Sequence, residues 1–143
     1  MNTEIEYIKN RAQGIARYSD KLREQMSGID KPFRDSFKAA GIIYSDSEQL
    51  FSDDIDYMRT DFYRLKITKI EGVWGIWIRK TNNLVREENE WEDFSTTKRG
   101  VLKAAAKRIL PFLTAYSKVL AEKLNEYHDL TEKTERMAKA ISS

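Results

Sequence analysis

The sequence predicts an α+β fold in which long N- and C-terminal helices pack around a small antiparallel β-sheet built on a hairpin of residues 62–80. The start and the last third of the chain carry apolar residues at alternating spacings of three and four, which is typical of helices with a narrow apolar stripe. Between them, two segments alternate with a period of two around a two-residue turn. The 143 residues are expected to form one domain, residues 1–143.

The first helix is predicted over residues 3–27. Thr3 and Glu6 match a capping box, and Ser27-Gly28 before Pro32 indicates the end of the helix. Ser19 interrupts the apolar repeat. The N-terminal stripe consists of Ile5, Ile8, Ala12, Ile15, Leu22 and Met26.

The next segments predict shorter elements. Residues 32–41 are typical of a short helix closed by Gly41. In residues 52–62, Ile55, Met58 and Phe62 continue a helical spacing from Phe51, so we expect a helix there, although Ile55 and Tyr57 also permit a strand. The polar connection after the hairpin has room for a short third strand around Leu84.

The hairpin of residues 62–80 separates two faces, because successive strand residues point to opposite sides. With Glu71-Gly72 as the turn, Trp77 lies opposite Lys66. We expect Trp74 in the core and Trp77 on an open face. The core face holds Tyr63, Leu65, Ile67, Trp74, Ile76 and Ile78, and the outer face holds Arg64, Lys66, Thr68, Gly75, Trp77 and Arg79.

The last helix is predicted to begin near Thr97, and Pro111 predicts either a kink or two helices meeting near Leu110. Its repeat is interrupted by Lys123 and Thr134. The C-terminal stripe consists of Leu102, Ala106, Ile109, Leu113, Tyr116, Leu120, Tyr127, Leu130, Met137 and Ile141. Because this stripe is longer than the first helix can cover, part of it is expected to contact another subunit.

Charge is balanced overall but segregated along the chain. The 25 basic and 23 acidic residues leave a formal charge of +2. Residues 95–121 contain basic residues and no acidic one, and Arg99, Lys103 and Lys107 recur every four residues as a basic ridge. This ridge and the outer-face residues Arg64, Lys66, Trp77 and Arg79 can bind a nucleic acid through phosphates and base stacking. The alternative is that they are solvated or paired with the acidic segments.

Known catalytic and metal-binding patterns are missing from the sequence. The chain contains no cysteine, which excludes disulfides, cysteine-bound zinc and thiol nucleophiles. The aspartates of residues 53–61 lack the glycine and glutamate of an EF-hand loop, and His128 is the single histidine. We therefore expect no catalytic residue, no metal and no cofactor. A charged start and the lack of long apolar runs predict a cytoplasmic protein that does not enter a membrane.

From Trp74 to Leu113 the chain reads WGIWIR, a polar loop and TTKRGVLKAAAKRILPFL. This order resembles small bacterial and prophage-encoded proteins of unknown function, in which a tryptophan-bearing strand precedes a basic helix with Leu-Pro. The resemblance implies an accessory protein of a mobile element and assigns no residue a role.

The function that we expect is a non-catalytic interaction or regulatory module, which binds itself as a homo-oligomer, or another protein, through the stripes. The alternative is a nucleic-acid-binding accessory protein that uses the basic residues of the segment 98–108 and the Trp77 face. A carboxylate-dependent metal enzyme is the third hypothesis.

Overall fold

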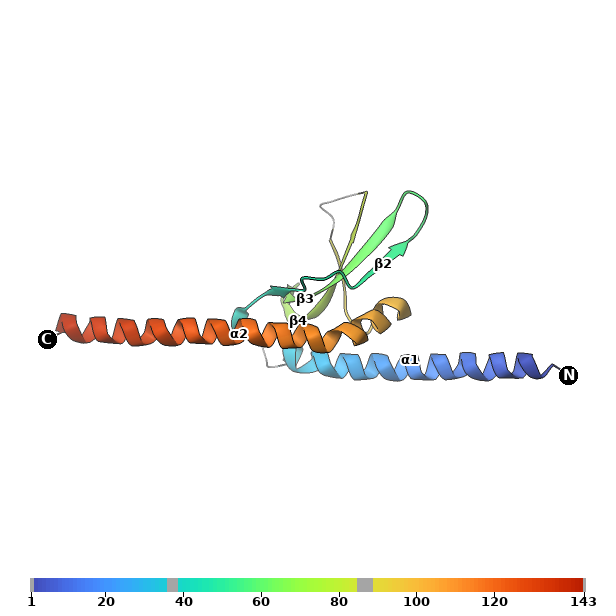
Figure 1. Ribbon diagram of the computed structural model, residues 1–143, viewed down its shortest axis with the longest axis horizontal. Helices are drawn as coiled ribbons and strands as arrows, with labels where there is room; N and C mark the ends of the chain where they lie inside the picture. The colour runs from blue at the N-terminus through green and yellow to red at the C-terminus, as the bar shows by residue number, and fades with distance from the viewer. Residues whose placement is uncertain (1, 36–38, 85–88, 143) are drawn as a thin grey trace. The chain divides into compact units, whose positions relative to one another are not determined.

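The computed structural model describes residues 2–35, 39–84 and 89–142, and it confirms the predicted α+β class (Figure 1). Two long helices, α1 (Thr3–Asp35) and α2 (Arg99–Ser142), enclose the strands in the sequence. The chain divides into two compact units, Met1–Ile109 and Leu110–Ser143. Within the described residues, neither helix has the length of apolar sequence required to cross a membrane. Between the helices come η1 (Ala39–Gly41), β1 (Tyr44–Ser45), β2 (Phe51–Asp54), β3 (Thr60–Ile70), β4 (Val73–Asn82) and β5 (Glu90–Glu92).

The sheet is antiparallel throughout and is built on the predicted hairpin. Its strand order is β1-β3-β4-β5, and β2 pairs with another part of β3. Glu71 and Gly72 have φ angles of 49° and 82°, which a two-residue hairpin turn with both central residues at positive φ requires. The predicted register is confirmed, since Lys66 lies opposite Trp77 and Arg64 opposite Arg79.

The core of the first unit lies on the predicted face of the hairpin. Gly100 shows how closely α2 approaches the sheet, because a Cβ atom there would lie 3.2 Å from Cζ of Phe51. Trp74, in contrast, is half-buried, so its predicted place in the core is wrong. It lies two residues after the turn, where Glu71, Gly72 and Val73 are all exposed. The buried apolar residues of this unit are Met26, Tyr63, Leu65, Ile67, Ile76, Ile78, Phe94, Val101, Leu102, Ala105 and Ile109.

Residues 51–62 comprise β2, a turn and the start of β3, so the helix predicted for residues 52–62 is wrong and the strand alternative holds for β2 and β3. β2 pairs with the start of β3, and Asp56 organises the turn between them. Its Oδ1 atom accepts hydrogen bonds from the backbone N–H groups of Met58 (2.7 Å) and Arg59 (2.9 Å). An aspartate that satisfies backbone donors in this way stabilises a turn in competition with a helix.

Helix α1 continues beyond its predicted end at Ser27-Gly28 and includes Pro32. A proline removes one helical hydrogen bond. Here Asp30 holds the turn around Pro32, because it is bonded to β4 and, within the helix, to Arg34. At the other end, Oδ1 of Asn2 accepts a bond from the N–H of Glu4 (3.1 Å), so Asn2 caps the helix in place of Thr3. Of the predicted helix 32–41, residues 36–38 lie outside the described residues, and residues 39–41 form η1.

Helix α2 runs as one helix with Pro111 inside it, so the alternative of two separate helices is wrong. The third strand beside the hairpin is β5, which pairs with β4 through Trp91 and Arg79. It does not include Leu84, which was the predicted position. Leu84 is exposed and donates its N–H to Oδ1 of Asn82, as in a turn.

Candidate functional site

The N-terminal stripe is exposed over the first half of α1. Ile5, Ile8 and Ile15 are 58%, 64% and 65% exposed. Further along the helix, Leu22 is half-buried and Met26 is buried. The same apolar repeat therefore belongs to the core at one end and faces outward at the other.

A groove between α1 and the start of α2 adjoins this exposed half. It has a volume of about 730 Å³. Three of its lining residues are cations, and they come from both helices. We call it the α1–α2 groove, and it is lined by Arg11, Gly14, Ile15, Tyr18, Ser19, Leu22, Arg99, Leu102 and Lys103.

Two of the basic residues near the start of α2 are paired with acidic residues. Lys98 forms a close ion pair with Asp53 of β2, and Arg108 makes two hydrogen bonds of 2.7 and 2.8 Å to the carboxylate of Asp46. The alternative that the sequence left open, in which basic residues pair with the acidic segments, therefore holds for Lys98 and Arg108. The basic ridge of Arg99, Lys103 and Lys107 is exposed, and within the described chain none of the three has an ion pair.

The Asp46–Arg108 pair is the best-defined charged contact of the first unit. Asp46 is 2% exposed, and burial alone would raise the pKa of its carboxyl. The hydrogen bonds from Arg108 and from the backbone of Glu48 outweigh burial, so the pKa lies below its ordinary value. This contact fastens α2 to the segment that follows β1 and has the geometry of a structural ion pair.

In the second unit, the C-terminal stripe is exposed from residue 121 onward. Every residue from 121 to 142 is exposed, including Tyr127 (66%), Leu130 (57%) and Ile141 (83%). Acidic residues dominate residues 122–132, and basic residues dominate residues 133–139. This segment therefore presents an apolar stripe flanked by charges that change sign along the helix.

One group in this segment has metal-ligand chemistry. Side-chain ligand atoms of His128, Asp129 and Glu132 lie within 4.8 Å of one another. The imidazole nitrogens of His128 are 3.5 and 3.6 Å from the two carboxylates, and all three residues are exposed. The group has the geometry of a surface ion-pair cluster.

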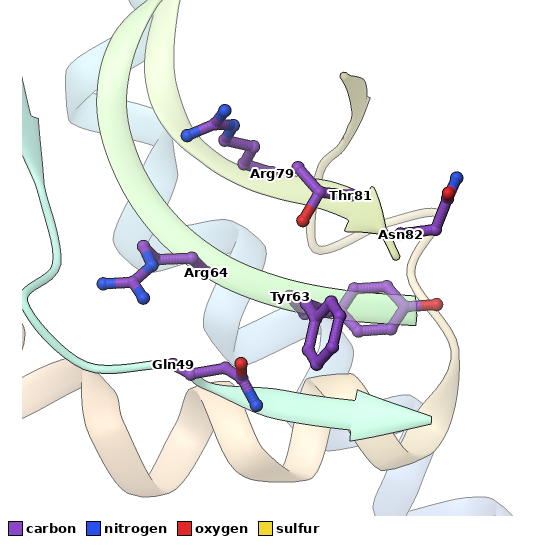
Figure 2. Close-up of a pocket in the computed structure, with 7 residues that line it drawn as sticks. Gln49, Tyr63, Arg64, Arg79, Thr81 and Asn82 are labelled. Carbon is purple, nitrogen blue, oxygen red and sulfur yellow. The ribbon is translucent and has the colours of Figure 1, made fainter. Parts of the chain in front are cut away.

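The outer face of the sheet brings together four of the predicted binding residues, Arg64, Lys66, Trp77 and Arg79. Figure 2 shows the hollow beside them, about 360 Å³ in volume, with Arg64 and Arg79 on neighbouring strands. Arg64 donates to the backbone oxygen of Asp46 (2.7 Å), and Arg79 donates to Oδ1 of Asn89 (2.8 Å). Arg64 also interacts electrostatically with the carboxylate of Asp46, whereas the bonded acceptor of Arg79 is neutral. Because like charges that face each other across strands repel, an anion between Arg64 and Arg79 would reduce their repulsion.

Trp77 is not the open ring that the sequence predicted. The guanidinium of Arg34 lies 4.4 Å from its ring centroid, and its Nε1–H donates to the backbone oxygen of Val73 (3.3 Å). The last turns of α1 thus cover this part of the outer face. Trp91, which β5 adds to the face, was not among the predicted residues, and Lys66 lies 5.7 Å from its ring.

Asp30 was also missed, and it is the residue that fixes α1 to β4. It is 3% exposed, and its Oδ1 atom accepts the backbone N–H of Ile76 at 2.7 Å. Gly75 makes room for it, since a Cβ there would lie 3.1 Å from the same oxygen. Burial raises the pKa of Asp30 above its ordinary value, although the bonds from Ile76 and Arg34 oppose this effect. The spacing of Asp30 and Arg34 was the available sequence signal.

The structure does not bring the basic ridge to the outer face. Arg99 and Lys103 line the α1–α2 groove, Arg64 and Arg79 line the hollow on the sheet, and the two cavities share no lining residue.

No protein-family model matches the chain, and searches of the curated proteins and of the solved structures return no significant match.

Proposed function

We propose that this protein is a non-catalytic, cytoplasmic interaction module that assembles through the N-terminal and C-terminal stripes. The observation that supports this proposal is the exposure of both stripes on long helices, at Ile8 and Ile15 in α1 and at Tyr127 and Leu130 in α2. The resemblance of residues 74–113 adds the proposal that the module serves a mobile element. Location of the gene among phage or plasmid genes would support that part.

The energetic argument concerns residues 121–142 of α2. At 1.5 Å per residue this segment is about 33 Å long, and all of its residues are exposed. In proteins, most of the stability of a helix comes from packing of an apolar face against other structure. Burial of apolar surface contributes about 25 cal/mol per Å². A partner that covers the stripe would therefore supply the missing stability.

Light scattering at micromolar concentration tests the assembly, and we expect a dimer or a larger species. Ile8→Lys and Leu130→Lys should each shift the protein toward monomer without unfolding it, because both side chains are exposed in the isolated chain. Leu84→Lys is the matched control, since Leu84 is 56% exposed but belongs to neither stripe. A wild-type protein that is strictly monomeric would contradict the proposal.

Nucleic-acid binding is the second candidate function, and the hollow between Arg64 and Arg79 is the observation that favours it. Each phosphate contact to a single strand contributes about −0.7 to the slope of log affinity against log salt. Fluorescence anisotropy with a labelled single-stranded oligonucleotide should then show that Arg79→Gln flattens the slope by about that amount. Absence of binding at low salt, where screening is weakest, would remove this candidate.

A further inference from the structure

We infer that the α1–α2 groove is occupied by residues 120–141 of α2 from a second copy of this chain, which run antiparallel to α1. The inference rests on the proposed assembly function and names the partner and the orientation. A helix that lays an apolar stripe into a groove is a common mode of recognition. The positions at which the two stripes are interrupted and the charges that border them support this pairing.

The interruptions of the two stripes define the register. In an antiparallel helix pair, the first apolar position of one heptad faces the second of the other. Ser19 and Lys123 are interruptions of the two stripes, and they can face each other in such a pair. The same register pairs Ile5 with Met137, Ile8 with Thr134, Ala12 with Leu130, Ile15 with Tyr127, and Leu22 with Leu120.

The neighbouring registers are less favourable. A shift of one heptad in either direction places Lys123 opposite Ala12 or opposite Met26. Each of those pairings would bury a lysine against an apolar side chain, which costs free energy because the charge loses its hydration. A polar pair at one layer is a known means by which helix pairs select one register. Ser19 opposite Lys123 meets this requirement.

Charge selects the antiparallel direction. In this register, residues 122–132 of the second copy lie beside residues 10–20 of α1, where the groove is. The groove residues include Arg11, Arg99 and Lys103, whereas residues 122–132 contain four acidic residues and one lysine. Residues 133–139, with three basic residues, lie beside the acidic start of α1 at Glu4 and Glu6. The reverse direction would place Glu4 and Glu6 nearer to the acidic part of the segment.

This arrangement gives two of the ridge cations a partner. Arg99 and Lys103 are exposed and lack an ion pair in the described structure, and the acidic face of the second copy supplies one. Each chain carries both the groove and the segment. Two copies can therefore exchange segments reciprocally, which closes the assembly as a twofold dimer.

Disulfide cross-linking tests the pairing directly, because the chain contains no cysteine. Chains that carry Ser19→Cys alone are mixed with chains that carry Lys123→Cys alone, so a mixed disulfide can form only between two copies. Gln13→Cys, exposed on another side of α1, replaces Ser19→Cys in the control mixture. Circular dichroism confirms that each variant folds, and Ile15→Cys with Tyr127→Cys serves as a second pair.

We expect the mixed disulfide to form about 10³-fold faster than in the control, since a bound partner has a millimolar effective concentration against micromolar free protein. If scattering shows a dimer but both pairs cross-link no faster than the control, the pairing is wrong and the assembly function stands. Preferential disulfides between two Ser19→Cys chains, or between two Lys123→Cys chains, would likewise overturn it. A monomer at micromolar concentration would overturn both proposals.

Discussion

At the scale of single residues, Asp30 accepts a backbone hydrogen bond from a part of β4 that β5 does not pair with. β5 pairs with β4 at residues 78–80, and Asp30 accepts the N–H of Ile76 just before this pairing begins. An unpaired edge N–H that is buried costs free energy, and an exposed one invites pairing with another chain. A buried carboxylate that is bonded to both Ile76 and Arg34 satisfies this donor and holds the end of α1.

Substitution of Asp30 should separate its role as an acceptor from its charge. Asp30→Ala is expected to lower the free energy of unfolding by about 1–3 kcal/mol, because the N–H of Ile76 remains buried without a partner. Asp30→Asn retains an oxygen acceptor and should cost less. Urea denaturation measures both variants, with the exposed Asp35→Ala as the control. Equal losses for the alanine and asparagine variants would contradict the role of Asp30 as an acceptor.

Asp46 predicts a pH dependence of stability. Burial raises the pKa of its carboxyl, but the hydrogen bonds from Arg108 and from the backbone of Glu48 outweigh burial, so the pKa in the folded protein lies below its ordinary value. The folded state therefore binds this proton more weakly than the unfolded state does. The stability that Asp46 contributes is complete above its unfolded pKa of about 3.9 and is lost as the pH falls through the lower folded value.

Asp46→Asn should accordingly destabilise the protein by about 2 kcal/mol at pH 7, the usual contribution of hydrogen bonds to a charged group. The difference from wild type should shrink as the pH falls below about 4, because the Asp46 carboxyl of the unfolded chain then binds a proton while that of the folded protein is still ionised. Urea denaturation at pH 7 and at pH 3 measures the difference in the free energy of unfolding between the variant and wild type, with the exposed Asp20→Asn as the control. A difference that stays constant over this range would show that the pair contributes by packing alone.

At the scale of elements, the hairpin was predictable because a two-residue turn fixes its register. Both helices were predictable because their apolar repeats are long. β1, β2 and β5 are too short for a period to be recognised, and the spacing of Phe51, Ile55 and Met58 matched a helix by chance. The end of α1 depends on Ile76, which is 46 residues away from Asp30 in the sequence. The α1–α2 groove depends on how two distant segments pack, which local sequence patterns do not encode.

The contact between α1 and the outer face can be measured as a coupling energy. Arg34 over Trp77 should give a favourable coupling of about 0.5–1 kcal/mol in a double-mutant cycle, the range for a partly exposed cation–π contact. The variants are Arg34→Ala, Trp77→Ala and the combination of both, compared by urea denaturation. Arg17, whose guanidinium lies over the ring of Tyr18, is the control and should show no coupling to Trp77. A coupling near zero for Arg34 would mean that the ring is free to bind a ligand.

At the scale of the whole molecule, the charge layout is informative where the net charge is not. A formal charge of +2 gives little long-range attraction to nucleic acid. Asp53 and Asp46 neutralise Lys98 and Arg108, which leaves the ridge of Arg99, Lys103 and Lys107 as the exposed cations of this part of α2. Residues 122–132 are predominantly acidic, so their charge is opposite to that of the ridge. In the proposed dimer, these residues of the second copy supply acidic partners for Arg99 and Lys103.

The three ridge residues distinguish the two functions, because Arg99 and Lys103 line the α1–α2 groove and Lys107 does not. If the groove binds a second copy, Arg99→Gln with Lys103→Gln should weaken the dimer about 30-fold at low salt, because the twofold dimer contains the groove twice and loses four surface ion pairs of about 0.5 kcal/mol each. Lys107→Gln should then leave the dimer unchanged. Light scattering over a concentration series measures the dissociation constant, and glutamine preserves the helix.

A phosphate-binding ridge predicts another pattern, in which each of the three substitutions flattens the salt dependence of duplex DNA binding by about 0.9. Equal effects of all three on DNA affinity, with none on the dimer, would assign the ridge to nucleic acid.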